Sequence, residues 1–88
     1  MDKVGLTKLL NTSLKKRFPN IIEDIIVIEE ELEPSILYYN HVYVILKNYD
    51  DLLMYSDDIK SYIKDISNYV LKYGGKVINQ ISFSMDTQ

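Results

Sequence analysis

Apolar side chains recur at a helical spacing through the first eighteen residues, and basic side chains flank them. The apolar members of this pattern are Leu6, Leu9, Leu10, Leu14 and Phe18. Steps of three or four residues place them on one stripe of an α-helix. Pro19 ends the pattern, because the residue before a proline is disfavoured in the α region. The pattern predicts an amphipathic helix that stops at about residue 18.

Two strand patterns follow. Residues 24–32 are rich in β-branched side chains and too few for a typical helix, which favours a strand. Pro34 and Ser35 indicate a turn or a looser loop. Residues 41–47 then alternate, so that one face carries Val42, Val44 and Leu46 and the other carries His41, Tyr43 and Ile45. The register is strongly specified if one of these faces is buried.

A second, longer helical pattern covers residues 51–73. Its apolar positions are Leu52, Tyr55, Ile59, Ile63, Ile66, Val70 and Tyr73, with Tyr62 and Tyr69 widening the stripe. Asp50 or Ser56 is a suitable N-cap, so the pattern fits either one helix or a short turn followed by a helix from about residue 57. Gly74 and Gly75 provide the left-handed ending that helices commonly use.

The last pattern, residues 76–86, alternates and predicts a strand with one apolar and one polar face. Ile81, Phe83 and Met85 form the apolar side, and Gln80, Ser82 and Ser84 the polar side. The chain is expected to be a single α+β domain over residues 1–88, of order α-β-β-α-β. Two helices would pack on one face of a three-stranded sheet, as in a KH-like or ferredoxin-like two-layer sandwich. The long helix permits a parallel crossover between the last two strands.

The expected core joins that sheet face to the two helices. Its sheet members are Val42, Val44, Leu46, Ile81 and Phe83. Its helix members are Leu10, Leu14, Ile59, Ile63, Ile66 and Val70. Tyr43, Ile45, Ser82 and Ser84 would then lie on the uncovered sheet face.

Composition narrows the class of protein. With 88 residues, 47% hydrophobic and 26% charged, the chain fits one globular core. It has no cysteine, which excludes disulfides, thiolate metal sites and cysteine nucleophiles. No apolar run approaches the roughly 20 residues of a membrane span, and the start does not resemble a signal peptide. We expect a cytoplasmic protein, or a component of a particle assembled in the cytoplasm.

The net charge of −3 is unevenly distributed. Residues 1–20 hold five basic side chains against Asp2, a balance of +4, whereas the rest holds five lysines against twelve acids, a balance of −7. Such a field repels phosphate over most of the surface and attracts it only near the first helix. The candidate nucleic-acid contacts are Lys8, Lys15, Lys16 and Arg17.

Catalytic and metal-binding patterns are weak. His41 is the only histidine, no acid-histidine-nucleophile spacing surrounds it, and it is expected to be a half-exposed strand residue. The acidic groups Glu29, Glu30, Glu31, Glu33 and Asp50, Asp51, Asp57, Asp58 lack the spacing of a calcium loop. The three glycines, Gly5, Gly74 and Gly75, form no phosphate-binding loop. We expect no enzyme, no cofactor, no metal and no small-molecule substrate.

Seven of the eight tyrosines divide into two groups. Those at helical spacing, Tyr55, Tyr62, Tyr69 and Tyr73, are most simply packed at the rim of the core with the hydroxyl in water. Others lie in or beside the loop before the second strand, or on the uncovered sheet face. The candidate protein interface is Tyr38, Tyr39, His41, Tyr43 and Ile45.

Residues 25–86, with VYVILKN, a long helix and the strand ISFSMD, resemble the strand-helix-strand portion of ribosome-binding factor A. The resemblance covers about two thirds of the chain and rests on element order and a few apolar positions. It implies a type II KH-like fold and association with RNA. The family's Ala-x-Gly kink is replaced by Ile66-Ser67-Asn68, and no GXXG loop is present. We therefore do not assign the chain to that family.

Two hypotheses about function follow. The first is a non-catalytic protein-interaction or structural module, a small oligomeric or partner-bound subunit of a larger assembly such as a phage or virus particle. It rests on the acidic balance and on tyrosine, which is enriched at interfaces. The abundance of Ile, Asn, Lys and Tyr fits the AT-rich coding common in phages. The alternative is an RNA- or ribosome-associated assembly factor that contacts phosphates through the basic first helix.

Overall fold

The protein, seen here as a computed structural model, is described over residues 3–32, 37–72 and 78–85. The elements in chain order are helix α1 (Lys3–Arg17), strands β1 (Ile22–Leu32) and β2 (Leu37–Leu46), helix α2 (Tyr49–Lys72) and strand β3 (Ile78–Met85). The predicted order α-β-β-α-β is confirmed. The first two strands are longer than predicted, because pairing continues beyond the segments with the clearest apolar pattern.

The three strands form one mixed sheet with β2 in the centre. β1 pairs with β2 in antiparallel fashion, and β2 pairs with β3 in parallel fashion. The parallel crossover through α2 is therefore confirmed. The ladder is irregular between Ile22 and Asp24 on β1 and between Asn40 and His41 on β2.

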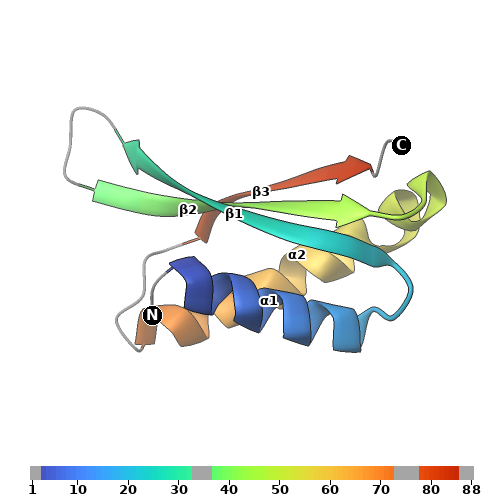
Figure 1. The fold of residues 1–88 in the computed structure, drawn as a ribbon, viewed down its shortest axis with the longest axis horizontal. Coiled ribbons are helices and arrows are strands. Elements are labelled where there is room, and N and C mark those ends of the chain that lie inside the picture. Colours follow the sequence, from blue (N-terminus) through green and yellow to red (C-terminus); the bar gives the residue numbers. More distant parts are fainter. Residues whose placement is uncertain (1–2, 33–36, 73–77, 86–88) are drawn as a thin grey trace.

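Both helices cover the same face of the sheet (Figure 1), which confirms the predicted two-layer packing. The buried apolar side chains between the layers are Leu6, Leu10, Leu14, Phe18, Ile22, Ile25, Val27, Val42, Val44, Leu46, Ile59, Ile63 and Val70. Ile66, Ile81 and Phe83 pack against them while partly exposed. Eight of the eleven residues expected in the core are buried there, the other three lie at its margin, and β1 adds three buried residues that were not expected.

The α1–β1 connection explains where α1 stops. The Phe18 N–H still donates to the Leu14 carbonyl (2.8 Å), but Pro19 cannot continue the helix. Asn20 then adopts a left-handed conformation with φ 65°, which asparagine tolerates better than most residues. The Lys47 N–H donates to the Ile21 carbonyl (3.1 Å), joining this turn to the end of β2.

Helix α2 is continuous over 24 residues, which decides between the two alternatives left open by the sequence. Asn48 immediately precedes the helix, and its carbonyl accepts a hydrogen bond from the Asp51 N–H (3.2 Å). The N-cap prediction was wrong on both residues, since Asp50 lies in the first turn and Ser56 lies inside the helix. The helix begins earlier because Tyr49 and the two acids after it suit a first turn, where negative charge is favourable.

The tyrosines of α2 do not all pack alike. Tyr55 and Tyr62 lie edge-on to Phe18, with ring centroids 6.3 and 6.1 Å apart, which confirms their place at the rim of the core. Tyr69 is 55% exposed, so it does not widen the buried stripe. Tyr73 lies outside the described residues.

Candidate interaction face

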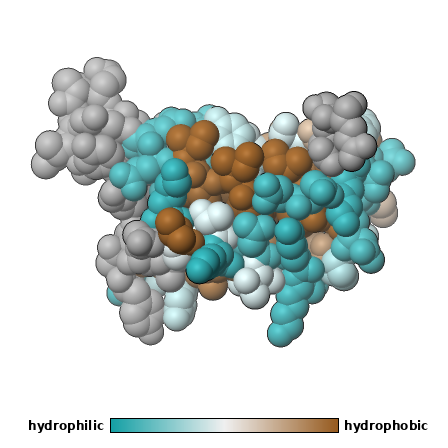
Figure 2. Space-filling view, in the orientation of Figure 1, coloured by the Kyte–Doolittle hydropathy of each residue, from teal (hydrophilic) through white to brown (hydrophobic). Residues whose placement is uncertain are grey.

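The sheet face opposite the helices carries four large apolar side chains on adjacent strands. We call Ile26, Ile28, Tyr43 and Ile45 the outer patch. Ile26 and Ile28 are 44% and 40% exposed, and Tyr43 and Ile45 are half-buried. Figure 2 shows apolar side chains gathered in a band over the strand layer. Tyr43 and Ile45 therefore lie on the uncovered face, as predicted, while Val42 and Val44 are buried beneath it.

Strand register makes the outer patch continuous. Ile26 is paired with Tyr43, and Ile28 is paired with His41. Side chains at directly paired positions lie about 4.5–5.5 Å apart between Cβ atoms, close enough for rings and branched chains to touch. The patch thus crosses from β1 to β2 without a charged side chain inside it. Asp24, paired with Ile45, and Glu30 lie on the same face at its two ends.

His41 lies beside the outer patch and connects all three strands. Its Nε2 is 2.7 Å from Ser82 Oγ on β3, and its Nδ1 is 3.3 Å from Glu30 Oε1 on β1. Its ring stacks on that of Tyr43, with centroids 4.1 Å apart and planes 17° apart. His41 is only 6% exposed, so the expectation of a half-exposed residue was wrong. Its neighbours on both sides and the stacked tyrosine ring cover it.

The imidazole of His41 lies between a carboxylate and a hydroxyl, those of Glu30 and Ser82. Serine hydrolases arrange their acid, base and nucleophile in the same way. Local sequence spacing does not reveal this arrangement, because the partners of His41 are 11 and 41 residues away and meet only through the sheet register. Acyl transfer also needs a cleft with donors aimed at the developing oxyanion. The three grooves described below are lined by other residues. What the geometry shows is a link across the three strands through the His41 imidazole, with the Tyr43 ring stacked on it.

The remaining candidates for a protein interface lie at the other end of β2. Tyr38 and Tyr39 are strand residues paired with Glu31 and Glu30, so of the two predicted places, in the loop or beside it, they lie beside it. Aromatic residues favour strands, and the hairpin extends further than Pro34 suggested. Their side chains lie outside what the structure describes.

The candidate nucleic-acid contacts are all exposed on α1. Lys16 and Arg17 line an open groove of about 510 Å³ with Thr12, Ser13 and Tyr62. Arg17 also lies over the Phe18 ring, 5.5 Å from its centroid. A neighbouring groove of about 260 Å³ adds Asp58 and Asp65. The structure therefore places carboxylates beside part of the basic surface.

A third groove, of about 380 Å³, lies between α2 and β3. Across residues 3–32, 37–72 and 78–85, no cluster of histidine and acidic side chains is arranged to hold a metal ion. Among the helices described, none combines the length and the apolar character needed to cross a membrane.

The fold and this face define the class of protein, a small α+β two-layer domain with an uncovered apolar sheet face. Comparison with protein-family models, curated proteins and solved structures finds no match for the chain. The likeness to KH-like or ferredoxin-like folds therefore stays a prediction.

Ile26 and Ile28 were not among the predicted interface residues, although the sequence carries a signal for them. Four consecutive apolar residues, 25–28, are typical of a strand buried on both faces. Here only Ile25 and Val27 are covered by the helices. The apolar pattern of β1 thus indicates that the face opposite the helices, which carries Ile26 and Ile28, is also suited to burial.

Proposed function

We propose that the protein is a non-catalytic interaction module that docks through the outer patch, as a small subunit of a larger assembly such as a phage or virus particle formed in the cytoplasm. The observation that carries the proposal is the run Ile25–Ile28, which is apolar on both faces of β1 although the helices cover one. A protein bound to the outer patch would cover the other face of β1.

The composition of the outer patch supports this role. Exposed apolar patches on a small domain often mark contacts with other proteins, and tyrosine is enriched in such contacts. The link from His41 to Glu30 and Ser82 holds the Tyr43 ring in place before binding. A side chain already fixed in one position loses less entropy when a partner binds.

A paired substitution tests the proposal. Ile26→Thr combined with Tyr43→Thr removes the centre of the outer patch but keeps two residues that favour strands. We expect wild-type protein to form a defined oligomer or to retain an identified protein partner, and the variant to lose that contact. The variant should stay folded, with a melting temperature lower by about 4–8 °C, because Tyr43→Thr removes the stack on His41, worth about 1 kcal/mol. Size-exclusion chromatography with light scattering, and pull-down with partner identification, provide the two measurements.

Leu53→Thr is the matched control, because Leu53 is 69% exposed on α2, away from the sheet face. It removes exposed apolar surface away from the outer patch and should leave the contact intact. The proposal fails if wild-type protein is strictly monomeric and retains no protein, or if both variants weaken the contact equally.

A second candidate function is RNA or ribosome contact through α1, favoured by the open groove where Lys16 and Arg17 lie beside the hydroxyls of Thr12 and Ser13. Asp58 and Asp65 next to Arg17 oppose it, since they repel phosphate. Replacing Lys8, Lys15, Lys16 and Arg17 by glutamine should reduce RNA binding and its salt dependence together. Co-purified protein would support the first function, and co-purified RNA that the glutamine variant no longer retains would support the second.

A further inference from the structure

Strand β3 forms an edge of the sheet that carries no charged side chain. In the part of the chain that the structure describes, β3 pairs with β2 and with no other strand. Its residues, INQISFSM, contain no acid and no base. The opposite edge strand, β1, carries Glu23, Asp24 and three glutamates at 29–31, and its ladder is irregular near Ile22. Charges are a common protection against strand addition, and β3 has none. Its ladder with β2 is irregular near Asn40, as the ladder of β1 is near Ile22, so charge is what distinguishes the two edges.

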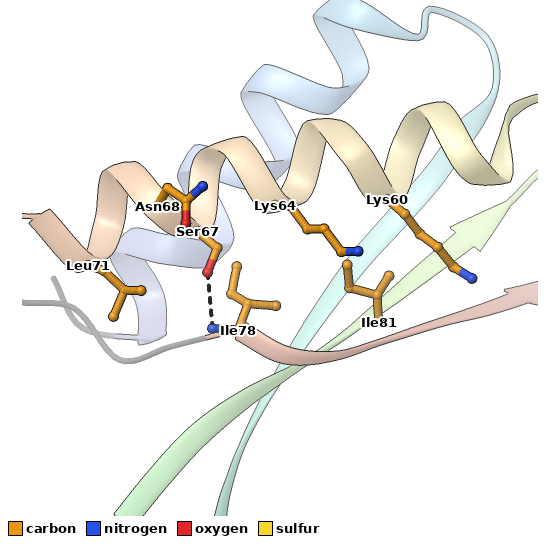
Figure 3. Close-up of a pocket in the computed structure, with 7 residues that line it drawn as sticks. All are labelled: Lys60, Lys64, Ser67, Asn68, Leu71, Ile78 and Ile81. Atoms are coloured by element: carbon orange, nitrogen blue, oxygen red, sulfur yellow. Dashed lines mark hydrogen bonds between the residues drawn. The ribbon is translucent and has the colours of Figure 1, made fainter.

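The groove between α2 and β3 lies along this edge (Figure 3). Its lining residues are Lys60, Lys64, Ser67, Asn68, Leu71, Ile78 and Ile81. At one end, the Ile78 N–H donates to Ser67 Oγ (3.3 Å), which ties the start of β3 to the helix. Beyond that point, Lys60 and Lys64 extend from α2 toward β3. The groove therefore has an apolar floor and two cationic groups above it.

The two lysines make this edge positive within an acidic protein. Lys60 Nζ lies 5.7 Å from the centroid of the Phe83 ring on β3, so its charge is held near the strand. Within the described residues, neither lysine takes part in an ion pair. Because Lys60 and Lys64 are positive, a partner drawn to this edge by charge would itself be acidic, although the whole chain has a net charge of −3.

We propose that the β3 edge binds an extended segment of another protein, in which acidic side chains occupy alternate positions. The segment would add a fourth strand to the sheet, with its backbone paired to β3. Alternate side chains of a strand lie about 6.7 Å apart on one face. Lys60 and Lys64 are four residues apart on a helix, a rise of about 6 Å. Two carboxylates at alternate positions therefore match the two ammonium groups.

Charge disfavours pairing of β3 with the β3 strand of a second copy. If two β3 strands paired around a twofold axis, both copies would place their helices on the same face of the joined sheet. Lys60 and Lys64 of each copy would then face those of the other, which is unfavourable. Pairing of β3 with the acidic β1 of another copy would be head-to-tail and would produce a ring or a filament, which measurement of self-association without peptide detects.

The test uses full-length ¹⁵N-labelled protein and an acetylated ten-residue peptide that alternates threonine and glutamate. We expect saturable amide shift changes in β3 and around Lys60 and Lys64, with slower hydrogen exchange along β3 in the complex. The double variant Lys60→Glu, Lys64→Glu should bind this peptide at least about tenfold more weakly, because two exposed ion pairs become repulsive. The same variant should bind a threonine-lysine peptide that the wild type does not bind.

Three controls keep the result specific. A glutamate peptide with two central threonines replaced by proline cannot donate all its ladder hydrogen bonds and should lose most of its affinity. The Ile26→Thr, Tyr43→Thr variant should bind the peptide like the wild type, which separates this edge from the outer patch. Circular dichroism checks that each variant is folded.

Four outcomes would overturn the proposal. The first is that the wild-type amide shifts do not change at millimolar threonine-glutamate peptide, and the second is that the proline peptide binds as tightly as the unmodified one. The third is that the threonine-lysine peptide does not bind the double glutamate variant, and the fourth is that the protein self-associates through β3 without peptide. Equal binding of the proline peptide would mean that charge alone, without strand pairing, attracts the ligand.

Discussion

His41→Leu is the substitution whose cost follows most directly from the structure. The ring of His41 reaches Ser82 at 2.7 Å and Glu30 at 3.3 Å, and it stacks on Tyr43. Leucine keeps most of the apolar bulk, so the change removes these interactions without a large cavity. Since Ser82 and Glu30 are partly exposed, water can replace the ring nitrogens as their partner.

The magnitude follows from the interactions that a leucine side chain cannot make. A net contribution of about 0.5–1.5 kcal/mol for each hydrogen bond, and about as much for a stacked ring pair, gives a total near 2–3 kcal/mol. In a domain of this size, 1 kcal/mol corresponds to about 4–8 °C in melting temperature. We therefore expect the His41→Leu protein to melt about 10–20 °C below the wild type.

Thermal and urea unfolding followed by circular dichroism measure this destabilisation. A double-mutant cycle with Ser82→Ala isolates the His41–Ser82 interaction, and we expect a coupling of about 1 kcal/mol. If His41→Leu melts within about 2 °C of the wild type, or if the two changes are additive, then His41 does not link the strands as described.

Three further predictions test other parts of the molecule. Leu14→Ala, at a fully buried core position, should lower the free energy of unfolding by about 2–5 kcal/mol in urea titrations, whereas Leu53→Ala on the exposed helix face should change it little. Asn20→Val should cost about 1–2 kcal/mol because of the left-handed φ, and Asn20→Gly should cost almost nothing; equal costs would refute the conformational explanation. Wild-type and Ser82→Ala proteins should hydrolyse p-nitrophenyl acetate equally slowly, and an acyl group found on Ser82 by mass spectrometry would contradict the non-catalytic proposal.

The sequence was a good guide where local periodicity decides the structure. Leu10 and Leu14 on the first helix, and Ile59 and Ile63 on the second, are buried because steps of three or four residues put them on one stripe. Alternation likewise placed Val42 and Val44 inward. These features depend on neighbours along the chain and require no knowledge of which strands pair.

The link through His41 was missed because it depends on pairing between distant segments. Ser82 reaches the imidazole only because β3 lies parallel to β2 in one particular register, and Glu30 only because β1 lies antiparallel on the other side. A shift of one residue would move either side chain to the opposite face. The exposed side chains of Ile26 and Ile28 likewise became evident only once the face covered by the helices was known.

The mixed sheet has a kinetic consequence. The β1–β2 ladder begins at Leu32 and Leu37, five residues apart, whereas Val42 meets Ile81 only after 39 residues of chain. Closing the longer loop costs more entropy, and pairing between distant residues slows folding. We expect the β1–β2 hairpin to form first and the edge strand β3 to pair with β2 last. Until then one side of β2 stays open, so a crowded refolding solution should favour exchange of the terminal strand between molecules.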